Sequence, residues 1–145
     1  MEYAQLKDVL YETYPLHTFE KIRYADTDRQ GHVNNAVFHT CFETGRVELL
    51  YDPQKPLYDP DGSFVIAHAN VDYLGEIKWP GTVEIGTGIA KVGTSSIRIL
   101  QGLFQNGKLV ATSETVIVHV DNEKKTSKPL SDLARNVLTQ AVFSK

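Results

Sequence analysis

The sequence predicts an α+β fold in which an antiparallel sheet of five to six strands wraps round one long central helix. A helix with broad apolar rows follows a polar turn near residue 34. After a loop, four segments of alternating apolar and polar residues follow one another, as in a run of antiparallel strands. Because a sheet must bury its apolar face against another element, the long helix is expected to cover it.

Length and composition predict a single folded domain that spans residues 1–145. Hydrophobic residues make up 41% and charged residues 23% of the chain, which is typical of globular proteins. The net charge is −3 and basic residues are scattered, so no nucleic-acid partner is expected. The single cysteine, Cys41, excludes an intrachain disulfide and a Cys-rich metal site.

Neither an export signal nor a membrane span is expected. Charged residues interrupt the apolar residues of positions 1–10, which is unlike a signal peptide. Apolar runs elsewhere are shorter than the roughly 20 residues that a helix needs to cross a bilayer. We therefore expect a cytoplasmic protein with no membrane partner.

The first elements are a short helix and a strand. Residues 1–14 are predicted to form a helical addition to the domain, because Leu6, Val9 and Leu10 recur near helical spacing. Residues 17–24 mix β-branched and aromatic residues with charges, as expected of a half-buried strand that leads into the polar turn.

The central helix is expected to begin after Asn34, a favoured N-cap residue, and to continue through two apolar rows, Val37 with Cys41 and Phe38 with Phe42 and Leu49. Gly45 costs about 1 kcal/mol in helix propensity, so its presence predicts a close approach to another backbone. Cys41 is interpreted as a small buried residue. Glu43 and Arg46 are three residues apart and are interpreted as a structural pair.

Four strands are predicted after the Pro-rich loop of residues 51–62, over residues 64–74, 82–92, 95–105 and 108–120. In the first of them, one face is expected to carry Val65, Ala67, Ala69, Val71 and Tyr73. A last amphipathic helix is expected over residues 131–143. The free edge of such a sheet tends to pair with another copy, so a homo-oligomer is predicted, either a dimer or a dimer of dimers.

The polar turn and the start of the helix carry the most informative motifs: Arg23-Tyr24-Ala25-Asp26-Thr27-Asp28, Gly31-His32-Val33-Asn34-Asn35-Ala36, then Phe42-Glu43 and Arg46. The chain resembles the 4-hydroxybenzoyl-CoA thioesterase-like branch of the hotdog-fold superfamily through these residues. The resemblance extends to the segments 65–74, 92–96 and 109–115 and covers about residues 17–130.

The resemblance implies hydrolysis of acyl-CoA thioesters with Asp28 as the catalytic carboxylate and the backbone amide near Asn35 as oxyanion donor. Physical chemistry supports this arrangement, since a helix N-terminus presents unpaired N–H groups and a partial positive charge to a carbonyl oxygen. The carboxylate can attack the carbonyl or activate water, and a thiolate is a good leaving group. No metal and no cofactor is expected; coenzyme A enters as part of the substrate.

Other residues of the turn have both a functional and an ordinary interpretation. His32 is the third catalytic candidate, because it could contact substrate or steady Asp28, although a histidine at a helix start is commonly solvated. Thr27, Gly31 and Asn34 are predicted to line the substrate site; an ordinary turn explains the glycine nearly as well, and helix capping by Asn34 is compatible with a positioning role. Both aspartates of the turn could also simply cap it.

Two further groups are substrate-binding candidates through the resemblance. His68 and Asn70 lie on the polar face of their strand, which in related dimers borders the acyl pocket of the neighbouring subunit; a polar interface is the alternative. Thr94, Ser95 and Ser96 match a segment that approaches coenzyme A in the family, yet they are also ordinary turn residues beside a glycine.

Two alternative functions remain open. A hotdog hydratase or dehydratase would use an Asp and a His for proton transfer, and a non-catalytic acyl-CoA-binding module would use the same fold to bind ligand without turnover. The residues do not distinguish acyl-chain length, CoA from acyl carrier protein, or a nucleophilic from a general-base role of Asp28.

Overall fold

The computed structural model describes residues 1–29 and 31–144, so Gln30 of the predicted turn lies outside the described residues. Two short 3₁₀ helices open the chain, Tyr3–Asp8 and Tyr11–Thr13, and a third spans Tyr24–Asp26. The other elements are β1 Leu16–Lys21, α1 Asn35–Leu50, β2 Gly62–Tyr73, β3 Thr82–Val92, β4 Ser96–Gln105, β5 Lys108–Asp121 and α2 Asp132–Gln140.

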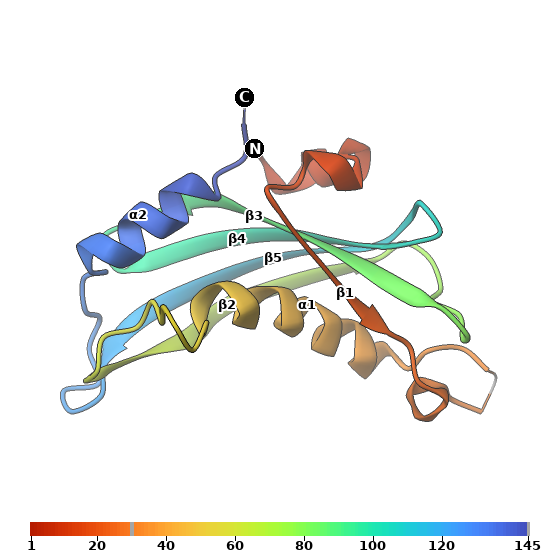
Figure 1. Ribbon diagram of the computed structural model, residues 1–145, viewed down its shortest axis with the longest axis horizontal. Coiled ribbons are helices and arrows are strands. Elements are labelled where there is room, and N and C mark those ends of the chain that lie inside the picture. Colours follow the sequence, from red (N-terminus) through yellow and green to blue (C-terminus); the bar gives the residue numbers. More distant parts are fainter. Residues whose placement is uncertain (30, 145) are drawn as a thin grey trace.

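The strands form one five-stranded sheet in the order β1-β3-β4-β5-β2, and every pair is antiparallel. The sheet curves over α1, which crosses its concave face (Figure 1). A two-residue turn joins β4 to β5, where Asn106 and Gly107 both have positive φ, as tight hairpins require. The predicted arrangement of a sheet round one long helix is confirmed.

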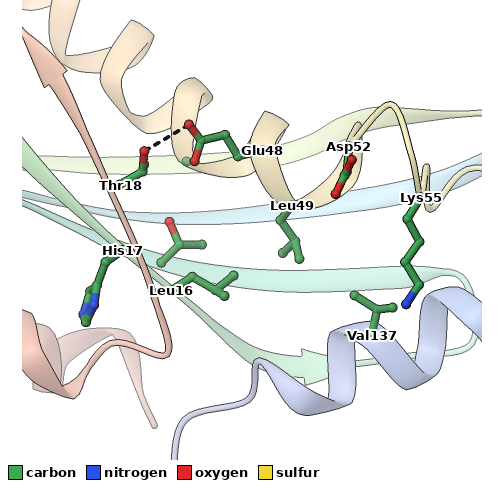
Figure 2. A pocket seen from close by; sticks show the side chains of 10 residues that line it. Leu16, His17, Thr18, Glu48, Leu49, Asp52, Lys55 and Val137 are labelled. Carbon is green, nitrogen blue, oxygen red and sulfur yellow. Dashed lines mark hydrogen bonds between the residues drawn. The ribbon is translucent and has the colours of Figure 1, made fainter.

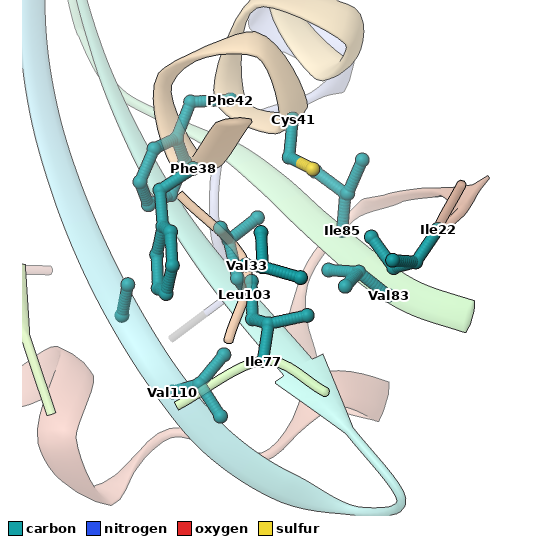
Figure 3. Close-up of a cluster of buried hydrophobic side chains, with 11 residues drawn as sticks. Ile22, Val33, Phe38, Cys41, Phe42, Ile77, Val83, Ile85, Leu103 and Val110 are labelled. Carbon is teal, nitrogen blue, oxygen red and sulfur yellow. The ribbon is translucent and has the colours of Figure 1, made fainter. Parts of the chain in front are cut away.

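Two apolar clusters pack between α1 and the sheet. Figure 3 shows the one beneath the first half of α1, where Phe38, Cys41 and Phe42 meet Ile85 and Leu103. The second lies beneath the end of α1 and includes α2. Cys41 is 1% exposed, which confirms its interpretation as a buried residue, and burial raises the pKa of its thiol to about 12.

The helix packs closely on the sheet at Gly45, as predicted, but the atoms it approaches belong to side chains and not to another backbone. A Cβ at this position would lie 2.6 Å from both Gln101 Nε2 and Thr87 Oγ1. The Gln101 amide donates to Phe42 O at 2.9 Å and to Thr87 Oγ1 at 3.0 Å. Glycine therefore leaves room for a buried side-chain amide that ties α1 to the sheet.

The pairing of Glu43 with Arg46 is not formed within 4 Å in the described part of the chain. Arg46 instead donates to Gln101 Oε1 at 3.3 Å. Burial lowers the pKa of Arg46, and the charge of Glu43 partly opposes this change. This contact between α1 and β4 takes the place of the Glu43–Arg46 pair, because the Arg46 guanidinium lies on the side of α1 that faces the sheet.

The face assignment in β2 is wrong at its start, because a bulge interrupts the register between Ile66 and His68. Ile66 pairs with Ile117, a core residue, and therefore shares the face that α1 covers. Val65 turns to the opposite face. After the bulge the predicted alternation is confirmed, since Val71 packs against the core beneath α1.

The N- and C-terminal segments cover part of the convex face of the sheet. Residues 1–14 form two 3₁₀ helices in place of one amphipathic helix, and Leu6 is the one buried residue within those two helices. Tyr14, which follows, is 2% exposed, and its hydroxyl has no hydrogen-bond partner among the described residues. The last helix begins at its Ser131 N-cap and ends at Gln140, three residues before the predicted end.

Candidate active site

A tight reversal of the chain presents Asp28 just before α1. The Asp28 N–H donates to His32 O at 2.7 Å, and the Gly31 N–H donates to Asp28 O at 3.1 Å. Gly31 has φ of 79°, in the left-handed region that glycine adopts without strain. Asp28 Oδ1 accepts the His32 N–H at 3.2 Å, so the carboxylate is tied to its own loop.

Asp26 has the contacts of a structural residue. Its carboxylate accepts the Arg23 N–H at 2.8 Å and the Arg23 guanidinium at 2.9 Å, while its carbonyl accepts the Asn34 N–H at 2.9 Å. Burial by itself would raise the pKa of Asp26, but the hydrogen bonds from Arg23 outweigh it and hold the pKa below its ordinary value. Asp26 therefore fixes the loop to the start of α1.

The amino end of α1 offers an unused backbone donor. The predicted N-cap is confirmed, because Asn34 Oδ1 accepts the Ala36 N–H at 2.9 Å, and Asn34 O accepts the Val37 N–H at 2.9 Å. Within the described residues, the N–H of Asn35 has no hydrogen-bond acceptor. It points out of the positive end of the helix dipole, which suits it to bind a carbonyl oxygen.

Three residues that no sequence motif indicated, Glu76, Ile77 and Lys78, contact the loop. Val33 donates to Ile77 O at 3.1 Å, and His32 pairs with Lys78 as an antiparallel bridge. The His32 imidazole lies 3.5 Å from a carboxylate oxygen of Glu76. Residues 76–78 follow β2 by a few positions, so no local sequence pattern connects them with the turn before α1.

The loop lies on the surface of the single chain. Asp28, Asn34 and Asn35 are exposed, and Thr27 and His32 are half-buried. The loop therefore carries an exposed carboxylate at Asp28 and, seven residues later, an exposed residue at the first position of α1.

His68 and Asn70 lie on the face of the sheet opposite α1. They alternate with Ala69 and Val71, which face the helix. His68 Nε2 is 3.8 Å from a carboxylate oxygen of Glu114 on that outer face. In one chain, the structure does not bring these two residues to Asp28, and their substrate-binding role stays a prediction.

The segment Thr94, Ser95 and Ser96 lies at the other end of the sheet from Asp28. It connects β3 to β4, whereas the Asp28 loop adjoins the first residues of β3 through the Ile22 N–H, which donates to Gly81 O at 2.9 Å. The 11 residues of β3 correspond to about 35 Å. Thr94 O and Ser95 O accept the N–H groups of Leu130 and His119, each contact belonging to the fold of its own end.

A cavity of about 250 Å³ opens between β1, the second half of α1 and α2 (Figure 2). Its lining combines the apolar Leu16, Leu49 and Val137 with the charged Glu48 and Lys55. None of the predicted site residues lines it.

Among the described residues, no group of three His, Cys, Asp or Glu side chains is placed to hold a metal ion, and the expected lack of a cofactor stays a prediction. No helix of the described chain is long and apolar enough to cross a bilayer.

A family model of the thioesterase-like superfamily matches residues 22–138. The chain belongs to this superfamily. No curated protein matches the sequence. Membership confirms the resemblance drawn from the motifs before and within α1, and it makes the chain a thioester hydrolase by class.

Solved structures agree with this assignment. A predicted thioesterase from Bacillus stearothermophilus is 30% identical, with a TM-score of 0.78 over 89% of this chain and 97% of that one. A thioesterase from Thermus thermophilus, complexed with coenzyme A and Zn, is 29% identical, with a TM-score of 0.74 over 88% and 93%. A 1,4-dihydroxy-2-naphthoyl-CoA thioesterase from Synechocystis shares the fold at 16% identity, with a TM-score of 0.77 over 85% and 94%. The sheet round α1 is the hotdog fold.

Proposed function

We propose that this protein hydrolyses acyl-CoA thioesters to the free acid and coenzyme A, with Asp28 as the catalytic carboxylate. The observation that carries the proposal is the fixed loop before α1, where Asp28 Oδ1 accepts the His32 N–H at 3.2 Å. The same loop leads directly into the N-terminus of α1, at which the Asn35 N–H has no acceptor in the described chain. A carboxylate and an oxyanion donor are the two groups that acyl transfer needs most.

In the proposed reaction, the thioester carbonyl oxygen accepts the Asn35 N–H, and the dipole of α1 stabilises the charge that develops on it. Asp28 then acts in one of two ways. As a general base it takes a proton from the water that attacks the carbonyl carbon; as a nucleophile it forms an anhydride that water hydrolyses. In both routes the C–S bond breaks, the thiolate of coenzyme A leaves and takes up a proton, and water supplies the new carboxyl oxygen.

A second copy of the chain is proposed to complete the site. β2 forms one edge of the sheet, and its Val65 and Ile66 are 45% and 56% exposed. A 12-residue edge strand with exposed apolar side chains favours pairing with another strand. Antiparallel pairing of β2 with its copy would relate the two ends of the sheet by a two-fold axis, placing the partner's segment of residues 94–96 at the same end as Asp28.

The dimer proposal predicts twice the chain mass in light scattering at micromolar concentration. Ile66→Lys, which puts a charge on the exposed edge, is expected to give monomers with little activity. Thr139→Lys on the exposed surface of α2 is the matched control and is expected to stay dimeric and active. A wild-type protein that is monomeric at full activity would contradict the proposal.

The test of function is a panel of acyl-CoA esters, from short to long chains and with aromatic acyl groups, assayed for release of the coenzyme A thiol. We expect turnover of at least one class. Hydration of enoyl-CoA without thiol release would favour a hydratase, and tight binding across the panel without turnover would favour a binding module; either result would overturn the proposal.

A further inference from the structure

We propose that Gln105, at the end of β4, is a positioning residue that holds the Asp28 loop in place through the backbone of Lys78. The inference depends on the proposed function, because it assigns a role in setting the geometry of that site. Gln105 belongs to none of the motifs that carry the family resemblance, and its side-chain hydrogen bonds go to Lys78 and not to Asp28.

The contact between Gln105 and Lys78 is bidentate. Gln105 Oε1 accepts the Lys78 N–H at 2.8 Å, and Gln105 Nε2 donates to Lys78 O at 2.9 Å. Both bonds go to the backbone of one residue, so the side-chain amide reproduces the pair of bonds that a neighbouring strand would make. Gln105 is 7% exposed, and a Cβ at Gly81 would lie 2.8 Å from its Nε2, so the amide has a closely fitted place.

Three stretches of backbone lie side by side between this amide and the catalytic carboxylate. Lys78 pairs with His32, and the preceding Ile77 O accepts the Val33 N–H at 3.1 Å. His32 in turn exchanges hydrogen bonds with Asp28 through both its N–H and its C=O. The Gln105 amide therefore takes the place of a strand at one edge of a small ribbon, and the stretch at the opposite edge carries Asp28.

The side chains beneath the ribbon explain why its position depends on the two hydrogen bonds between Gln105 and Lys78, which are called the Gln105 clamp below. Ile77 and Val33 are 0% and 5% exposed and point into the cluster under α1, as Figure 3 shows. Their packing sets how far the ribbon lies from the core, but it does not prevent the ribbon from shifting parallel to the sheet, because apolar packing is not directional. The two hydrogen bonds from Gln105 are directional, and they tie the ribbon to the last residue of β4.

Loss of the clamp is expected to affect the reaction more than the fold. The Lys78 backbone groups can turn to water, so the chain stays folded, but residues 77 and 78 gain freedom to shift. His32 and Asp28 shift with them, and a misplacement of about 1 Å at a catalytic group can lower the rate about 100-fold. Substrate affinity should change little, since Gln105 does not line the exposed surface beside Asp28.

The test uses Gln105→Met, which keeps the length of the side chain and removes both hydrogen bonds, and Gln105→Leu as a second apolar filling. Ser131→Ala is the control, because it removes the N-cap bond of α2, in which Ser131 Oγ accepts the Ala134 N–H at 3.0 Å, far from the ribbon. We expect all three variants to unfold about 2–6 °C below wild type. Only the two Gln105 variants should lose kcat, by about 10–100-fold, with KM within about threefold of wild type.

Amide hydrogen exchange gives a readout that does not depend on turnover. The N–H groups of His32 and Val33 should exchange faster in Gln105→Met than in wild type, whereas Ser131→Ala should leave them protected. Wild-type kcat in both Gln105 variants, or unchanged exchange at His32 and Val33, would overturn the inference. If wild type hydrolyses no acyl-CoA, the proposed function fails, and unchanged or faster exchange still decides whether the clamp exists.

Discussion

Replacing Asn35 with proline removes the proposed oxyanion donor while leaving the helix intact. Asn35 is the first residue of α1, a position at which proline is favoured because its missing N–H has no partner within the helix. Proline also requires an extended residue before it, and Asn34 already has φ −61° and ψ 141°. The substitution therefore removes the backbone N–H of residue 35 with little change to the backbone conformation.

The expected loss follows from what one oxyanion donor contributes. Removal of a single donor of this kind costs about 2.7–4 kcal/mol of transition-state stabilisation, or a 10²–10³-fold lower kcat. Stability should change by less than about 1 kcal/mol, since within the described chain the Asn35 N–H bonds to nothing and proline also restricts the unfolded state. A large kinetic effect with a small thermodynamic one is the signature of a donor used only in the reaction.

The assay is the steady-state release of coenzyme A thiol by Asn35→Pro and by Asn35→Ala, with thermal unfolding measured for both. Asn35→Ala keeps the backbone N–H and loses only the side chain, so it should retain most of the wild-type kcat. Equal kcat values for the two variants, or a proline variant as active as wild type, would refute the assignment of this amide.

Three further predictions concern the core. Gly45→Ala should destabilise the protein by about 1–3 kcal/mol in urea unfolding, because overpacking against two hydrogen-bonded side chains exceeds the gain of about 1 kcal/mol in helix propensity. Gly75→Ala is the control, because an added Cβ there meets only ordinary van der Waals contacts. A Gly45→Ala variant that is more stable than wild type would contradict the close approach. Tyr14→Phe should raise the free energy of unfolding by about 1 kcal/mol, since it removes a buried hydroxyl without a partner in the described chain, and a loss of stability would reveal a missing contact. Cys41 should resist thiol reagents at pH 8 in the folded protein because burial raises its pKa to about 12, and Cys41→Ala should keep its activity; rapid labelling would refute the buried placement.

Local patterns in the sequence were enough to predict the central elements. The N-cap at Asn34 and the apolar rows of α1 depend on residues within one helix. The break between the predicted strands 95–105 and 108–120 is equally local, because Asn106 and Gly107 there adopt the positive φ that a tight hairpin needs. These features were confirmed because no distant contact competes with them.

Features that depend on distant partners could not be predicted. The bulge after Ile66 follows from the register with β5, and it reverses the facing of the residues before it. Arg46 bonds to Gln101, 55 positions away, in place of its neighbour on the helix. The short 3₁₀ helices of residues 1–14 bury little of their own surface, so their apolar spacing did not decide their geometry.

The candidate site divides in the same way. Asp28 precedes the first residue of α1 by seven positions, so the motif by itself fixes that both belong to one turn and helix start, and their joint role in catalysis stays a prediction. Residues 76–78 and the side-chain amide of Gln105 lie beside the loop only because the folded sheet brings these distant positions together. The distance of Thr94 from Asp28 in one chain is likewise a property of strand length and not of any motif.

The most direct test of the proposed chemistry is the kcat of Asp28→Asn at saturating acyl-CoA. Asparagine keeps the size of the side chain, and its carbonyl oxygen can still accept the His32 N–H that Asp28 Oδ1 accepts at 3.2 Å, so the loop should stay in place. We predict at least a ~10³-fold lower rate of coenzyme A release, with an unchanged unfolding temperature. A variant that releases coenzyme A within about threefold of the wild-type rate would show that the carboxylate of residue 28 does not carry the reaction.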